Sequence, residues 1–179
     1  MKKLLTLAAF MLLTLTAGAQ SIVGTWKLTG EYAKELQKSI GDDEVDASFG
    51  FEFGSNTVKG LIWISGKSDE VSMDMVFKIP GTYTKTSQTV VCSFEKENME
   101  FEILDLKSED PDMKPMLEDP TTKGLVLNLV KEQMKKEFSE EKDDFYELFE
   151  NIDKFTVKSL TQNQLVIEVE DVEITFERK

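Results

Sequence analysis

The chain has 179 residues, carries 34 acidic against 21 basic side chains, and contains no histidine. Its net charge of −13 repels phosphate backbones and anionic lipids, so nucleic acid and a bare membrane surface are poor partners. The absence of histidine excludes Ser-His-Asp and Cys-His nucleophile systems and most zinc sites.

Residues 1–19 have the pattern of a signal peptide. Two lysines precede a short apolar run from Leu4 to Leu15, and a small-residue cleavage pattern ends at Ala19. The run is shorter than the roughly 20 apolar residues that a spanning helix needs. We therefore expect a mature chain from Gln20 that is exported to the periplasm or the cell exterior and is not inserted in a membrane.

Most of the following residues alternate between apolar and polar with a period of two. This alternation predicts strands over 22–28, 45–53, 58–65, 71–79, 82–86, 89–95 and 99–103. Between the first two, Tyr32, Leu36 and Ile40 step by four, which predicts a short helix over 32–40 ended by Gly41. Pro80-Gly81 is expected to break or bend the strand over 71–79. Short strands joined by tight turns favour an antiparallel sandwich or barrel.

The pattern changes between about residues 108 and 151. The segment 108–120 is acidic and holds three of the four prolines, which predicts an irregular linker. Asp119-Pro120 is a typical helix start. Helical spacing then continues to Asn151, either as two helices, the second capped by Ser139, or as one kinked helix. We interpret the segment as a helical insertion that either covers a barrel mouth or packs on one side of the sheet.

Strand alternation returns at the C-terminus, over 155–157, 165–169 and 172–178. The insertion is therefore flanked by strands on both sides. We expect residues 20–179 to form a single, mainly β domain.

Two residues near the ends of this domain favour a closed barrel. Trp26 has the inward parity of the first strand, and Arg178, the only arginine, has the inward parity of the last. First and last strands are neighbours in a barrel, so indole and guanidinium could stack there. Arg178 either completes the core at that end or grips an anionic ligand.

Gly24-Thr25-Trp26 opening the first strand, with a lone arginine closing the last, resembles the lipocalin and fatty-acid-binding (calycin) families. The run from Phe155 to Arg178 is also similar to the closing hairpin of small lipocalin-like proteins exported by Bacteroidetes. The resemblance implies an up-and-down antiparallel barrel of about 8–10 strands, closed by Gly24, Trp26 and Arg178, with a cavity for an apolar small molecule. The helical insertion and the lack of further arginines depart from that pattern.

Aromatic and methionine side chains share the inward parity of several strands. Barrels of this size are either filled by side chains or hold one small ligand. If a ligand binds, the candidate residues lining it are Phe49, Phe51, Phe53, Met73, Met75, Phe77, Phe94 and Phe101.

No catalytic or metal site is assigned. Cys92 alternates with apolar neighbours and is expected to be a buried small hydrophobe. Asp42, Glu44 and Asp46 partly match a calcium loop, but Phe53 occupies the position of the required distal glutamate. A solvated acidic surface is the simpler interpretation.

The leading hypothesis is an extracytoplasmic, non-enzymatic protein that binds or carries a small apolar ligand and needs no cofactor. The alternative is a structural or protein-interaction module without a ligand, which uses the barrel and its helical insertion. An exposed apolar stripe along Val126, Val130, Met134 and Phe138 would favour this alternative.

Overall fold

The computed structural model describes residues 21–40 and 44–179, without the side chains of residues 39–40, 136–145 and 148. Their strands are β1 Gly24–Thr29, β2 Val45–Phe53, β3 Thr57–Lys67, β4 Val71–Thr86, β5 Thr89–Phe94, β6 Glu100–Ser108, β7 Lys154–Leu160, β8 Gln164–Val169 and β9 Val172–Arg178. The helical elements are α2 Glu31–Ile40, η1 Lys96–Asn98, α3 Lys114–Glu118 and α4 Pro120–Glu150. None of the described helices is long and apolar enough to cross a membrane.

Eight of the strands close an antiparallel up-and-down barrel in the order β1-β2-β3-β4-β5-β7-β8-β9, with β9 pairing back to β1. Trp26 lies directly opposite Arg178 across the β1–β9 pair. The predicted fold class and the meeting of the chain's first and last strands are both confirmed.

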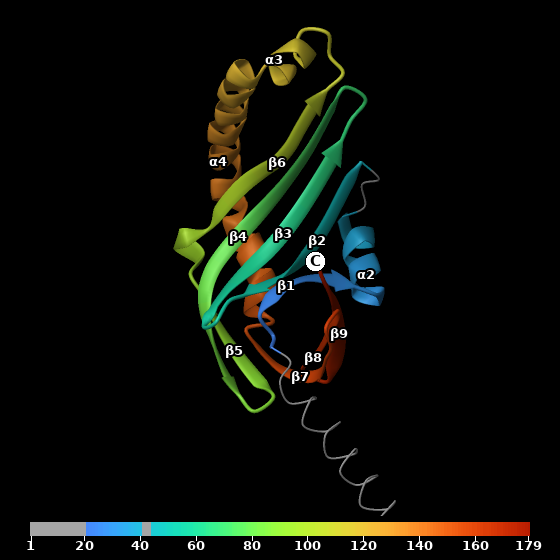
Figure 1. The fold of residues 1–179 in the computed structure, drawn as a ribbon, viewed down its shortest axis with the longest axis vertical. Helices are drawn as coiled ribbons and strands as arrows, with labels where there is room; N and C mark the ends of the chain where they lie inside the picture. The colour runs from blue at the N-terminus through green and yellow to red at the C-terminus, as the bar shows by residue number, and fades with distance from the viewer. Residues whose placement is uncertain (1–20, 41–43) are drawn as a thin grey trace, which may run out of the picture.

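The ninth strand, β6, lies outside the barrel. It pairs with residues 71–78 of β4, whereas β5 pairs with residues 81–86 along the same edge. Strands β2, β3 and β4 therefore continue past the barrel as an open sheet that β6 extends, and α4 runs along one face of it (Figure 1).

Of the expected break or bend at Pro80-Gly81, the break is wrong, because β4 is one strand of 16 residues, and the bend stays a prediction. Pro80 lies where the partner of β4 changes, after the Lys78–Glu100 pair and before the Gly81–Phe94 pair. The missing N–H of proline falls in this gap, and its carbonyl accepts a hydrogen bond from the N–H of Glu95 at 2.8 Å. A strand can tolerate proline at such a junction because no ladder bond is lost.

The predicted irregular linker is also partly wrong, since β6 reaches Ser108 and α3 occupies 114–118. Of the two possibilities for the following segment, a single helix is correct, because α4 runs for 31 residues. Asp119 caps it, accepting hydrogen bonds from the N–H groups of Thr121 and Thr122, both at 2.9 Å. Gly41, the predicted end of the preceding helix α2, lies outside the described residues.

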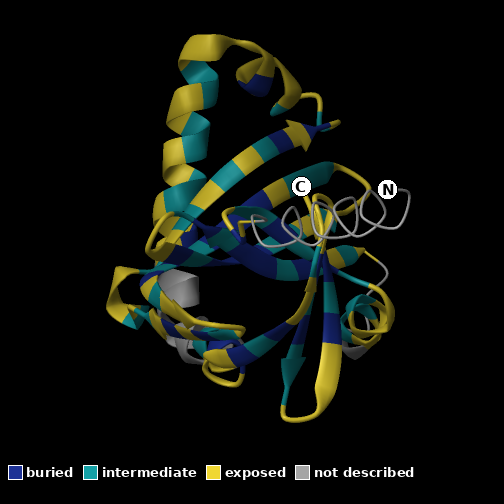
Figure 2. Ribbon diagram, turned by 60° about the horizontal axis from the view of Figure 1, so that its bottom comes forward, coloured by how far each residue is buried: buried dark blue, intermediate teal, exposed yellow. Residues whose placement is uncertain are grey.

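One hydrophobic core joins the barrel and the open sheet. Figure 2 shows the buried residues gathered on the strands, while much of α4 faces solvent. Met134 and Phe149 of α4 belong to this core, so the helical insertion is packed against the sheet rather than standing apart.

Candidate functional site

Arg178 stabilises one end of the barrel, which we call the closed end. Its guanidinium carbon lies 4.4 Å from the ring centroid of the fully buried Trp26. Its Nε donates to the carbonyl of Gln162 at 2.7 Å, and one terminal nitrogen donates to the carbonyl of Val23 at 3.1 Å. A Cβ on Gly24 would lie 2.5 Å from the guanidinium, so a larger residue there would displace it, and the positive φ of Gly24 (136°) also favours glycine. These contacts give Arg178 a structural role at this end.

Four of the eight candidate ligand-binding residues lie inside the barrel: Phe49, Phe51, Phe53 and Phe94. Phe51 and Phe53 are fully buried, with ring centroids 5.5 Å apart, and Phe51 also stacks on Phe94 at 6.4 Å. Such separations are those of packed aromatic pairs. The barrel interior at these residues is therefore a packed core.

A helix residue completes this packing. Phe149, in the last turn of α4, is 0% exposed, and its ring centroid lies 5.3 Å from that of Phe94 and 6.2 Å from that of Phe49. A Cβ on Gly60 of β3 would lie 2.6 Å from the Phe149 ring. The sequence placed Phe149 on the inner face of a helix but not inside the barrel. The available signal was Gly60, since a glycine within a strand often marks a close approach.

The other four candidates lie on the open sheet, where β4 pairs with β6 instead of β5: Met73, Met75, Phe77 and Phe101. Phe77 and Phe101 are cross-strand neighbours whose ring centroids are 5.7 Å apart. Lys131 of α4 places its Nζ 5.9 Å from the Phe101 ring. This group packs under α4, apart from the barrel interior, and a ligand-binding role for all eight residues stays a prediction.

We call the opposite end of the barrel the mouth. Helix α2, the β8–β9 turn and the end of α4 lie at this end. An open cleft of about 320 Å³ lies there between α2 and strands β1, β2 and β9, and it is lined by Leu28, Tyr32, Glu35, Leu36, Phe49 and Ile174. Its lining is mostly apolar. Phe49 is half-buried and contacts the rings of Phe51 and Phe176, so it separates the cleft from the packed interior.

The Gln37 side chain joins helix α2 to the sheet by two hydrogen bonds. Residues 45–47 of β2 extend beyond β1, which pairs only with residues 50–53. The Gln37 amide donates to the carbonyl of Val45 at 2.6 Å and accepts from the N–H of Ala47 at 3.1 Å. These bonds replace those of a neighbouring strand and fix the wall of the cleft.

A broader depression of about 870 Å³ adjoins the cleft at Ile174. It lies between the end of α4 and strands β7 to β9, and its lining includes Ile152, Phe155 and Val172. The residues of α2 and Ile174 were not predicted as site residues. They belong to segments far apart in the sequence, and only closure of the barrel brings them together.

Cys92 is buried, and burial, helped by the nearby charge of Asp153, raises the pKa of its thiol to about 12. The thiol is therefore protonated at neutral pH and is a poor nucleophile. Among residues 21–40 and 44–179, no group of three or more His, Cys, Asp or Glu side chains is placed to hold a metal ion.

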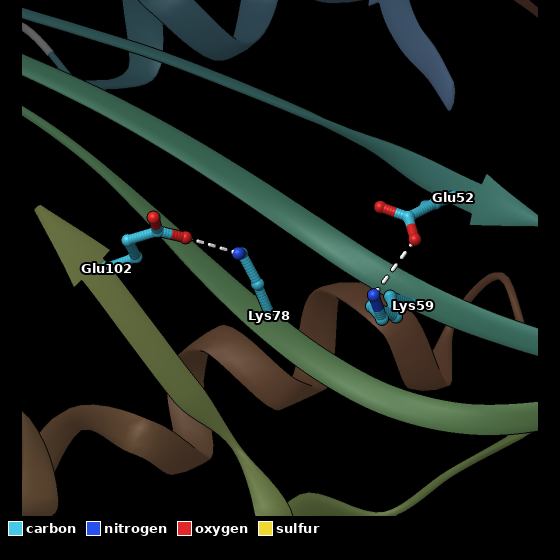
Figure 3. Close-up of polar contacts among 4 residues, drawn as sticks. All are labelled: Glu52, Lys59, Lys78 and Glu102. Atoms are coloured by element: carbon cyan, nitrogen blue, oxygen red, sulfur yellow. Dashed lines mark hydrogen bonds and ion pairs between the residues drawn. The ribbon is translucent and has the colours of Figure 1, made fainter. Parts of the chain in front are cut away.

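The outer face of the sheet carries two lysine–glutamate ion pairs. Lys59 pairs with Glu52 at 2.9 Å and Lys78 with Glu102 at 2.5 Å, on the side of the strands away from α4 (Figure 3). Hydrogen bonding to Lys78 lowers the pKa of the Glu102 carboxyl below its usual range. Both pairs are partly exposed, so they contribute little to stability.

The stripe that would favour an interaction module is largely turned inward. Met134 is buried, Val126 and Val130 are half-buried, and the Phe138 side chain lies outside the described residues. Among the described side chains of α4, the exposed large apolar ones are instead Leu125 and Leu129, at 63% and 73% exposure.

The chain matches no protein-family model, and no curated sequence is similar enough to count as a match.

Proposed function

We propose that this protein binds a small apolar molecule at the mouth of its barrel. The observation that carries the proposal is the mostly apolar cleft beside α2, whose volume of about 320 Å³ lies within the range of small-molecule sites. The packed barrel interior favours this location over the predicted one deeper inside. The proposal retains the leading sequence hypothesis and moves the ligand to the barrel end.

The cleft suits the end of an aliphatic chain or a ring. Leu28 and Ile174 form its buried floor and Leu36 its helical wall, while Tyr32 and Glu35 stand at the polar rim. Apolar walls supply affinity, and a few polar groups at the rim orient the ligand. The protonated Cys92 and the absence of histidine support a non-enzymatic role.

The test is titration with N-phenyl-1-naphthylamine, whose fluorescence rises in apolar sites. Leu36→Gln removes part of the apolar wall, and Leu125→Gln makes the same change at an exposed position of α4. Loss of about 1 kcal/mol of apolar contact corresponds to about fivefold weaker binding for Leu36→Gln. We expect Leu125→Gln to bind like the unchanged protein. Absence of binding by the unchanged protein, or equal effects of both substitutions, would refute the proposal.

A second candidate, a protein-interaction module, draws support from the exposed pair Leu125 and Leu129. Exposed apolar neighbours on one helix face are a common feature of contact surfaces. If this pair mediates self-association, sedimentation equilibrium detects a dimer that Leu125→Glu with Leu129→Glu abolishes. A protein that sediments as a monomer at all concentrations removes support for self-association.

A further inference from the structure

We propose that the mouth selects positively charged amphiphiles, such as long-chain amines, over carboxylates such as fatty acids. The inference rests on the proposed function and names the ligand class of the same site. Its basis is the set of charges around the apolar cleft.

The charged residues that line the mouth are almost all acidic. Among the described residues, Glu35 is the charged residue that lines the α2 cleft. The adjoining depression is lined by one cation, Lys154, against five carboxylates: Glu150, Asp153, Glu168, Glu170 and Asp171. A ligand whose chain lies against Leu36 and Phe49 would hold its polar end among these groups.

Nearby lysines reduce this excess without cancelling it. Lys158 pairs with Glu168 at 2.8 Å, and Asp171 and Glu173 also raise the pKa of its ammonium. On α2, Lys34 and Lys38 are exposed and line neither cavity. The mouth therefore keeps a surplus of negative charge beside its apolar cleft.

Apart from Lys154, three cations among the described residues that could hold a carboxylate lie away from the mouth. Arg178 is at the closed end and donates to two backbone carbonyls. Lys179 and Lys27 lie on the outer face, with their Nζ atoms 4.5 and 6.0 Å from the Trp63 ring. A carboxylate at the mouth would thus meet a single lining lysine, Lys154, among an excess of carboxylates, whereas an ammonium would gain several anionic partners.

The test compares three ligands of equal chain length, dodecylamine, dodecanol and dodecanoate, as competitors of N-phenyl-1-naphthylamine below their micellar concentrations at pH 7. Binding of dodecanol tests the proposed function. The ratio of the affinity for dodecylamine to that for dodecanoate, called the amine-to-carboxylate ratio below, tests the charge selection. At low salt we expect the amine to bind at least tenfold tighter than the carboxylate. This ratio should fall in 0.5 M NaCl, because added salt shortens the distance over which charges interact. Binding of the uncharged dodecanol should stay nearly unchanged.

A charge reversal locates the effect. Glu35→Lys should lower the amine-to-carboxylate ratio severalfold. Glu118→Lys on α3 changes the net charge equally at an exposed position outside the mouth, and it should leave the ratio nearly unchanged. Far-UV circular dichroism checks that both variants are folded.

Three results would overturn the inference. Dodecanoate could bind as tightly as dodecylamine, or the two reversals could shift the ratio equally, which would assign it to net charge alone. In both of these cases dodecanol binding leaves the proposed function standing. If none of the three ligands binds, the proposed function and the charge selection fail together.

Discussion

Phe149 provides the sharpest test of how the helical insertion is joined to the barrel. Its ring is fully buried among Phe49, Phe51 and Phe94 and lies against Gly60. Truncating a buried phenylalanine to alanine costs about 3–5 kcal/mol through lost burial and the cavity left behind. We expect Phe149→Ala to reduce the free energy of unfolding by that amount.

Gly60 gives the matched perturbation. A Cβ there would lie 2.6 Å from the Phe149 ring, so Gly60→Ala forces the ring to move. Overpacking of this kind costs about 1–3 kcal/mol. With Phe149→Ala the obstructing ring is gone, so Gly60→Ala should then cost little. The coupling energy between the two sites should therefore reach at least about 1 kcal/mol.

The assay is urea unfolding followed by circular dichroism, with the slopes compared to confirm two-state behaviour. Leu129→Ala, at 73% exposure on the same helix, is the control and should change stability by less than about 0.5 kcal/mol. If Phe149→Ala does not fold, Phe149→Leu replaces it in the same cycle. Additive effects of the changes at 60 and 149 would refute the packing described here.

Three further predictions concern the closed end, the core and the helix start. Arg178→Met should cost about 1–2 kcal/mol in urea unfolding, because Trp26 loses its stacked cation and two carbonyls lose a donor; an unchanged midpoint would contradict its structural role. The pKa of Cys92, raised from 9.0 to about 12, makes folding favour the protonated thiol. Stability should be intact below pH 9 and fall between about pH 9 and 12, and a fall of equal size in Cys92→Ala would show another cause. Asp119 has a pKa lowered by hydrogen bonds from the N–H groups at the start of α4. The Asp119 carboxylate should stabilise the fold above pH 4, and this stabilisation should be lost as the pH falls through the lowered pKa. Asp119→Asn should therefore weaken the decrease in the free energy of unfolding at acidic pH. An unchanged decrease would contradict this role.

Much of the barrel wall could be predicted because one face of each strand is buried. The alternation over 45–53 predicted β2 with the bounds that the structure shows. The break that the sequence pattern predicted at Pro80 is absent from β4 for a physical reason. Proline does not break a strand where the neighbouring partner changes, and a change of partner cannot be seen along a single chain.

The candidate site was less predictable. Inward parity selected Phe49, which does line the mouth, but it grouped barrel residues with Met73 and Phe101 of the open sheet. Alternation shows on which face of a strand a side chain lies. It does not show whether that face lines the barrel interior or the open sheet. Leu36 and Ile174 meet in the cleft although 138 positions apart in numbering, since α2 and β9 adjoin the same end of the barrel.

The sequence by itself determined the strand content, the helix start at Asp119 and the meeting of Trp26 with Arg178, because these depend on local periodicity, capping and the need of a barrel to close. Tertiary structure alone decided that β4 divides its edge between two partners and that Phe149 enters the barrel. It also decided that an apolar cleft opens beside acidic turns. These features arise from packing between distant segments, and the space that such packing fills or leaves is not encoded in any one of them.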